Sequence, residues 1–171
     1  MKLCKILTLF AAIVSAALCG CSKSSDTKLI TFNVAALKGV DTGLSHTTVV
    51  MPFSGTRLIM NTDTVLYSGD VESVYAAENA MPTGEKISGF YFVFGANGKR
   101  KLTNITASNI GSYIVMHFGG VPMGLRIIDT VVGDGRLFVC SEFDDSEKSI
   151  HEIVAEMNES IKKVNEIKSD M

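Results

Sequence analysis

The stretch FVFGANGKRKLTNITASNIGSYIVMHFGGVPMGLRIIDTVVGDGRLFV, residues 92–139, decides the fold of this protein. Within it, apolar side chains recur at Leu102, Ile105 and Ile110, and this spacing predicts a helix. Gly111 predicts the end of that helix, because glycine readily adopts the left-handed backbone conformation that follows a last helical turn.

Glycine-rich turns divide the second half of this stretch into strands. The apolar runs 112–118 and 121–132 flank Gly119-Gly120, a pair typical of tight hairpin turns. Gly133-Asp134-Gly135 predicts a second turn, which leads into the apolar run 136–143. We therefore expect three consecutive strands after the helix.

The segments that precede this stretch also have the composition of strands. Residues 28–36 alternate apolar with polar side chains, and 86–95 form an aromatic-rich run, so both predict strands. In the segment 47–53, Pro52 indicates a strand end or a strand at the edge of the sheet.

A further hairpin is predicted between these strands. The segments 56–60 and 64–68 flank Asn61-Thr62-Asp63, which has the composition of a three-residue turn. Ser68-Gly69-Asp70 then predicts a short helical turn or corner, and Met81-Pro82-Thr83-Gly84 a loop.

The C-terminal segment predicts a long amphipathic helix, capped by Asp144 or Asp145. Its apolar residues recur at steps of three and four: Ile150, Ile153, Val154, Met157, Ile161 and Val164. Such a stripe needs a sheet to pack on. The sequence therefore predicts an α+β domain over residues 28–168. We expect a mainly antiparallel sheet, with the mid-chain helix and the long C-terminal helix packed on one face.

The order of these elements resembles that of a known family. The motif Thr106-Ala107-Ser108-Asn109-Ile110-Gly111, followed by the hairpin turn Gly119-Gly120, is similar to the head subdomain in the first periplasmic domain of SecD, a protein-export membrane subunit. The resemblance covers about residues 86–158. It implies the fold and a surface that contacts unfolded or extended polypeptide. It does not imply proton-driven transport, because we expect no transmembrane helix after residue 20.

The motif residues also have a direct structural interpretation. Thr106 and Asn109 lie three positions apart, on one face of the predicted helix. Asn109 is placed to bond the last helical carbonyls, and Gly111 permits a positive φ. We expect these residues to end the helix and direct the next strand, and we predict no catalytic role for them.

The N-terminus has the pattern of a lipoprotein signal. Lys2 and Lys5 precede an uncharged apolar run, 6–20, that is shorter than the roughly 20 residues of a membrane-spanning helix. Leu18-Cys19-Gly20-Cys21 resembles the bacterial lipobox. That resemblance implies a signal peptide over residues 1–20, cleavage between Gly20 and Cys21, and lipid attachment at Cys21, with acyl chains such as palmitate.

Residues 21–27 would then form the acylated cysteine and a short tether. Ser22 stands where an aspartate resembles an inner-membrane retention signal, so we expect the outer membrane rather than the inner one. The domain would then face the periplasm or the exterior. The alternative is an ordinary secreted protein cut near Ala16 or Ala17.

Composition limits the function classes further. The net charge is −2 at pH 7 and becomes more negative without Lys2 and Lys5, which argues against nucleic acid as a partner. Cys140 is the one cysteine left after cleavage and acylation, and its apolar surroundings predict a buried side chain. The sequence contains no paired cysteine motif for zinc, and we predict no metal and no cofactor.

Three functions remain open from the sequence. We favour a non-catalytic, lipid-anchored accessory module of the cell envelope that binds a peptide or an envelope protein. An envelope hydrolase is the second possibility, although His46, His117 and His151 belong to no recognised catalytic motif. We expect His117 to be packed or at the surface, and His151 to face water. A purely structural envelope lipoprotein is the third.

Overall fold

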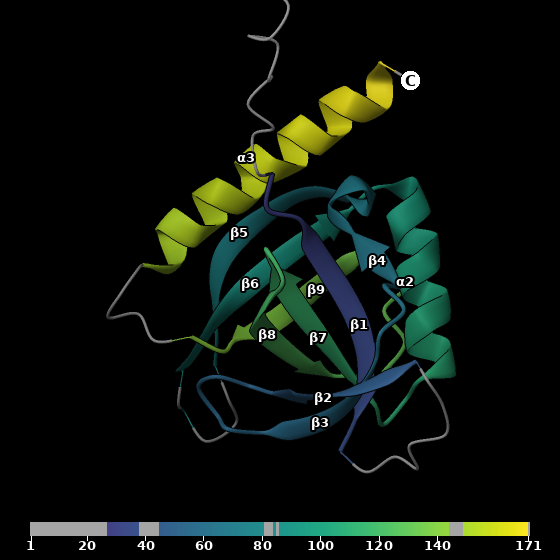
Figure 1. Ribbon diagram of the computed structural model, residues 1–171, viewed down its shortest axis with the longest axis vertical. Helices are drawn as coiled ribbons and strands as arrows, with labels where there is room; N and C mark the ends of the chain where they lie inside the picture. The colour runs from purple at the N-terminus through teal and green to yellow at the C-terminus, as the bar shows by residue number, and fades with distance from the viewer. Residues whose placement is uncertain (1–26, 38–44, 81–83, 85, 144–148, 171) are drawn as a thin grey trace, which may run out of the picture.

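The computed structural model describes residues 27–37, 45–80, 84, 86–143 and 149–170 (Figure 1). Within these ranges the chain forms, in order, β1 (Ile30–Ala36), β2 (His46–Val50), β3 (Arg57–Asn61), β4 (Leu66–Tyr67), η1 (Ser68–Asp70), β5 (Val71–Ala80), β6 (Lys86–Phe94), α2 (Ala96–Ser108), β7 (Tyr113–Phe118), β8 (Val121–Ile127), β9 (Arg136–Ser141) and α3 (Ile150–Ser169). The predicted α+β class and the two predicted helices are confirmed.

All nine described strands belong to one sheet. Their order is β2-β3-β1-β7-β8-β9-β6-β5, with β4 paired to β1, and every pairing is antiparallel. The sheet is strongly curved, and α2 and α3 lie against it (Figure 1).

The main hydrophobic core fills the space between the sheet and both helices. Phe90, Phe92 and Phe94 of β6 contribute alternate residues to it, as the period of two in a strand requires. Leu102 of α2 and Met157 of α3 are fully buried in the same cluster. Both helices therefore pack on one face of the sheet, as predicted.

A second, smaller core lies where the β2–β3 hairpin packs on the sheet. Ala35 of β1 and Val115 of β7 cluster with Val49, Met51, Leu58 and Met60 of the hairpin. Along β7, Ile114 and Met116 belong to the main core, so Val115 points to the opposite face. In Figure 1 this hairpin crosses the view below β7 and β8.

The predicted hairpin between 56–60 and 64–68 is wrong. β3 pairs with β2 and with the end of β1, whereas β4 pairs with β1 alone among the described strands. The Asn33 side chain donates to the backbone oxygens of Asn61, Thr62 and Asp63, at 3.1, 3.2 and 3.1 Å. This buried amide holds the turn against β1, so the chain continues along β1 and does not return along β3.

The predicted start of the C-terminal helix is also wrong. Asp144 and Asp145 lie outside the described residues, and α3 is capped by Ser149. The Ser149 hydroxyl accepts from the Glu152 backbone N–H at 3.4 Å, and the Glu152 carboxylate accepts from the Ser149 N–H at 3.0 Å. This reciprocal pair is a capping box, which satisfies two of the free donors at a helix start.

The predicted N-terminal features lie outside the described residues, including Gly20, Cys21 and most of the tether. So do Met81, Pro82 and Thr83 of the predicted loop. In the described part of the chain, no helix combines the length and apolar character needed to cross a bilayer.

Candidate functional site: an apolar groove at the hairpin tips

A groove of about 600 Å³ lies where two hairpin turns meet the start of α3. We call it the tip groove. Its lining residues come from five separate segments: Lys28, Pro52, Phe53, Phe118, Gly119, Val121, Pro122, Met123, Phe143, Ile153 and Glu156. The volume lies within the range of about 300–1,000 Å³ that is typical of ligand sites.

The walls of the tip groove expose large apolar side chains. Phe53, in the turn between β2 and β3, is 72% exposed, and Val121, at the start of β8, is 55% exposed. Apolar groups that remain exposed around a concave surface are typical of interaction sites. The lining therefore favours an apolar ligand.

Glu142 connects two walls of the tip groove. This residue is only 6% exposed, and its carboxylate accepts from the Ser54 backbone N–H at 2.9 Å. Its own N–H donates to the Met123 carbonyl at 2.9 Å. Glu142 therefore fixes the turn that carries Phe53 next to β8, which carries Val121.

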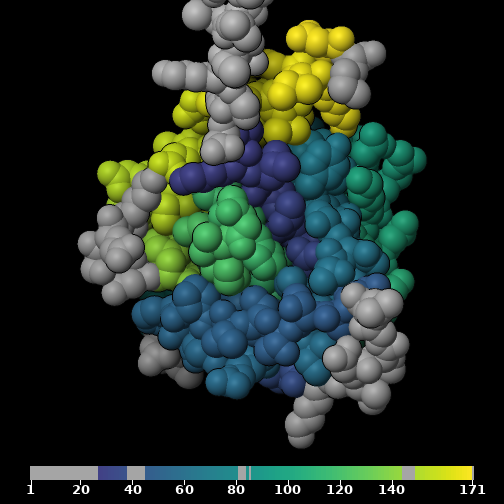
Figure 2. Space-filling model, viewed as in Figure 1, coloured from purple at the N-terminus to yellow at the C-terminus, as the bar shows by residue number. Residues whose placement is uncertain are grey.

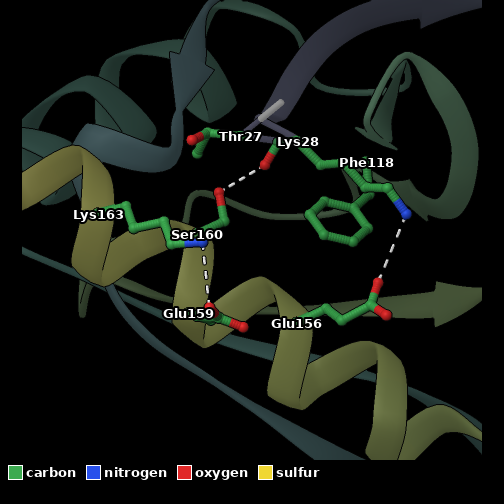
Figure 3. Close-up of a pocket in the computed structure, with 7 residues that line it drawn as sticks. All are labelled: Thr27, Lys28, Phe118, Glu156, Glu159, Ser160 and Lys163. Carbon is green, nitrogen blue, oxygen red and sulfur yellow. Dashed lines mark hydrogen bonds and ion pairs between the residues drawn. The ribbon is translucent and has the colours of Figure 1, made fainter. Parts of the chain in front are cut away.

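One end of the tip groove is formed by the N-terminal end of the described chain. Lys28 Nζ lies 3.6 Å from a Glu156 carboxylate oxygen and 5.7 Å from the centre of the Phe118 ring. The Ser160 hydroxyl donates to the Lys28 carbonyl. Figure 3 shows how these bonds attach residue 28 to α3, with the Phe118 ring between the two elements.

A smaller pocket of about 260 Å³ adjoins this end and shares Lys28, Phe118 and Glu156 with the groove. Glu159 and Lys163, which also line it, form an ion pair at 3.1 Å (Figure 3). Its charged side chains therefore pair with one another, as on a solvated protein surface.

The arrangement of the elements is similar to that in solved structures of SecDF. A crystal structure of SecDF in its super-membrane-facing form matches 77% of this chain, with a TM-score of 0.54 and 14% identity. The fold is SecD-like. A second structure, of SecDF described as a membrane component that enhances protein export, matches 84% of this chain, with a TM-score of 0.51 and 15% identity.

This likeness concerns the fold alone, because only 14–15% of the aligned residues are identical. The chain spans 19% of the first SecDF chain and 70% of the second. No known protein family matches the sequence. No curated protein matches it either.

In the SecD-like fold, the predicted motif residues form the end of α2. Thr106 is 1% exposed; its hydroxyl donates to the Leu102 carbonyl at 2.8 Å and accepts from the Val132 N–H at 3.0 Å. The Asn109 amide donates to the Ile105 carbonyl at 2.8 Å, and Gly111 has φ of 86°. These contacts agree with the structural interpretation of the motif.

One of the two predicted hairpin glycines reaches the tip groove. Gly119 and Gly120 have φ of 60° and 82°, as expected for a tight turn between β7 and β8. Gly119 also lines the groove. Sequence reasoning did not identify the groove, although Phe53, an aromatic residue in a turn directly after Pro52, was a signal for it.

The candidate ionisable residues have separate structural environments. His117 is 8% exposed and its Nδ1 has no hydrogen-bond partner among the described residues, so burial lowers its pKa. His151 is exposed, as predicted.

Cys140 is half-buried, not fully buried as predicted, because it lies near the end of β9. Loss of hydration raises the pKa of its thiol, so this group is protonated at neutral pH. In the part of the chain that the structure describes, no three His, Cys, Asp or Glu side chains gather where they would hold a metal ion.

Proposed function

We propose that this protein is a non-catalytic accessory module of the cell envelope that binds extended polypeptide in the tip groove. The observation that carries the proposal is the groove itself, with Phe53 and Val121 exposed on its walls. An unfolded segment exposes apolar side chains to water, and the groove offers them a surface on which that exposure is removed.

The likeness to SecDF supports the choice of a polypeptide ligand. SecDF is described as a membrane component that enhances protein export, a process whose cargo is polypeptide. The charges at the groove support it too, because the Lys28 ammonium group lies 3.6 Å from the Glu156 carboxylate. A site formed by apolar walls and a paired ion suits a variable polypeptide better than a ligand of one fixed charge.

We further propose that Cys21 carries a lipid that anchors this module to the outer membrane. Cys21 precedes Thr27, the first described residue, by six positions, and an extended chain spans at most about 3.6 Å per residue. The tether would therefore hold the Cα of Thr27 within about 22 Å of the Cα of the lipidated Cys21. Since Lys28 lines the tip groove, the groove would stay close to the membrane surface.

The anchor is tested on the protein made by cells. Mass spectrometry is expected to find a chain that begins at Cys21 and carries diacylglycerol and a further acyl chain. Cys21→Ser is expected to abolish incorporation of a clickable palmitate analogue and to release the protein from outer-membrane vesicles. An unmodified chain that retains residues 1–20 would refute the proposed lipid anchor. It would not affect the groove proposal, which is tested separately.

The groove is tested by photo-crosslinking in intact cells. A benzophenone amino acid placed at Phe53 or Val121 is expected to crosslink to polypeptide. The control is Tyr75 on β5, which is 56% exposed and does not line the groove. Equal crosslinking from Tyr75 and from the two groove positions would show that the groove has no binding role.

A pair of substitutions at Glu142 tests whether the shape of the groove matters. Glu142→Gln keeps an oxygen that accepts from the Ser54 N–H, whereas Glu142→Ala removes it. We expect crosslinking from Phe53 to fall in the alanine variant and to persist in the glutamine variant. Equal crosslinking in both variants would mean that the position of the β2–β3 turn is irrelevant to binding.

A further inference from the structure

The two outer strands of the described sheet differ in how their free edges are covered. On β5, the Asn158 side chain of α3 accepts from the Val74 N–H at 3.1 Å and donates to the Val74 carbonyl at 2.8 Å. This amide imitates the main chain of a neighbouring strand. At Val74, this edge of the sheet is therefore covered by the helix.

The other outer strand is β2, which pairs with β3 alone among the described strands. The Thr62 N–H donates to Ser45, and the Met51 N–H donates to Thr56. Hydrogen-bonded residues alternate along an antiparallel pair, so Thr47 and Val49 also bond to β3. His46, Thr48 and Val50 therefore direct their N–H and C=O groups away from the sheet.

Among the described residues no side chain or loop forms a hydrogen bond with these outward groups, and the strand lacks the usual protection of an edge. Free edges in proteins are commonly blocked by lysine, proline or a bulge, or by a helix placed over them. The sequence of β2, HTTVV, contains neither lysine nor proline, and its register with β3 is regular. Its threonines and valines favour an extended backbone, and Val50 is 48% exposed.

We propose that the outer edge of β2 is a docking site for an extended polypeptide segment, which joins the sheet as an additional strand. This inference rests on the proposed function and names its binding mode. A row of N–H and C=O groups on every second residue complements another extended main chain. Main-chain pairing is largely independent of sequence, which suits a module that binds many unfolded chains.

The edge of β2 is continuous with the tip groove. Val50 ends the strand two positions before Pro52, which lines the groove with Phe53. A polypeptide that pairs along His46–Val50 and continues past Val50 therefore reaches the apolar walls. Alternate side chains of the added strand lie beside Thr48 and Val50, so segments with β-branched residues at every second position bind best.

The test uses the full-length protein in detergent and a fluorescent peptide, KTVTVTVK, whose binding is followed by anisotropy. Thr48→Pro removes an outward N–H and leaves the bonds to β3, because Thr48 does not donate to that strand. Thr48→Val keeps the N–H and is the matched control. A second probe is the same peptide with every internal backbone nitrogen methylated, which removes the main-chain donors on both of its edges.

We expect Thr48→Val to bind the peptide as the unmodified protein does, and Thr48→Pro to bind it about tenfold or more weakly, with an unchanged circular dichroism spectrum. The methylated peptide should bind weakly to all three proteins. If the circular dichroism spectrum showed that Thr48→Pro had lost its sheet, that variant would be set aside. The affinities of the protein without substitutions for the two peptides would then test edge pairing.

Equal affinity for the two peptides would overturn the edge-pairing mode. If Phe53→Ser then bound neither peptide, the tip groove would still be a polypeptide-binding site, but one that binds without pairing to the edge of β2. A concentration-dependent dimer that Thr48→Pro abolishes, with no peptide bound, would mean that a second copy of the chain occupies the edge. That result would overturn the polypeptide site.

Discussion

Replacing Asn158 by alanine tests how far one side chain stabilises the closed edge of the sheet. Its amide forms both hydrogen bonds to Val74, at 3.1 and 2.8 Å, and a third to the Val154 carbonyl at 3.1 Å. Val74 itself is 0% exposed. Asn158→Ala therefore leaves the N–H and the C=O of a buried strand residue without a partner beneath α3.

The expected cost follows from these contacts. An unsatisfied buried polar group costs about 1–3 kcal/mol. Two such groups are left, but Asn158 is half-buried, so water reaches part of the space and the lower end of the range applies. Alanine also regains about 0.5 kcal/mol of helix propensity. We expect the free energy of unfolding to fall by about 1.5 kcal/mol, and the melting temperature by roughly 3–6 °C.

Urea unfolding followed by circular dichroism measures this change. The matched control is Asn165→Ala, the same substitution at an exposed position of the same helix. That variant should change the free energy of unfolding by no more than about 0.5 kcal/mol. If the two variants differed by less than this amount, the Asn158 amide would not be the group that closes the β5 edge.

Two further predictions concern a close contact and a buried base. In Gly98→Ala, the new Cβ would overlap the Asp70 carbonyl oxygen, so we expect a net loss of about 1–2 kcal/mol in urea unfolding despite better helix propensity. Gly133→Ala, where a Cβ meets nothing within 4 Å, should be neutral, and equal effects would contradict the contact. Burial lowers the pKa of His117 in the folded protein. As the pH falls, the unfolded protein therefore takes up a proton at this residue before the folded protein does. The free energy of unfolding keeps the whole contribution of neutral His117 above pH 6.5, the ordinary pKa of histidine. Below that pH it decreases, by up to about 1.4 kcal/mol per pH unit. His117→Asn should flatten this fall and His151→Asn should not; an identical pH profile for the two variants would refute the assignment.

Most of the local structure could be predicted from sequence because its signals are local. The end of α2 depends on Asn109 and Gly111, which contact residues within the same turn or require one particular φ. The turn at Gly119-Gly120 likewise depends on two residues in conformations that glycine tolerates. The stripe on α3 gave the correct buried face, with Ile153, Met157 and Ile161 in the core.

Strand pairing and the tip groove could not be predicted in the same way. The period of two fixes which face of a strand is buried, but it does not name the neighbouring strand. The pairing of β4 with β1 depends on Asn33, about 30 positions before the turn that it holds. The groove requires Lys28, Phe53 and Phe143 to meet, although no sequence spacing relates them.

The sequence by itself determined both helices and most strands, although not β5, together with the end of α2, its following hairpin and the apolar face of α3. Each of these depends on backbone preferences and side-chain periods that operate within a few residues. Only the tertiary structure decided that Asn158 closes one edge of the sheet while β2 leaves the other free, and that two hairpin turns form a groove beside the N-terminal end of the domain. Those features depend on contacts between distant segments, which form only when the whole core packs.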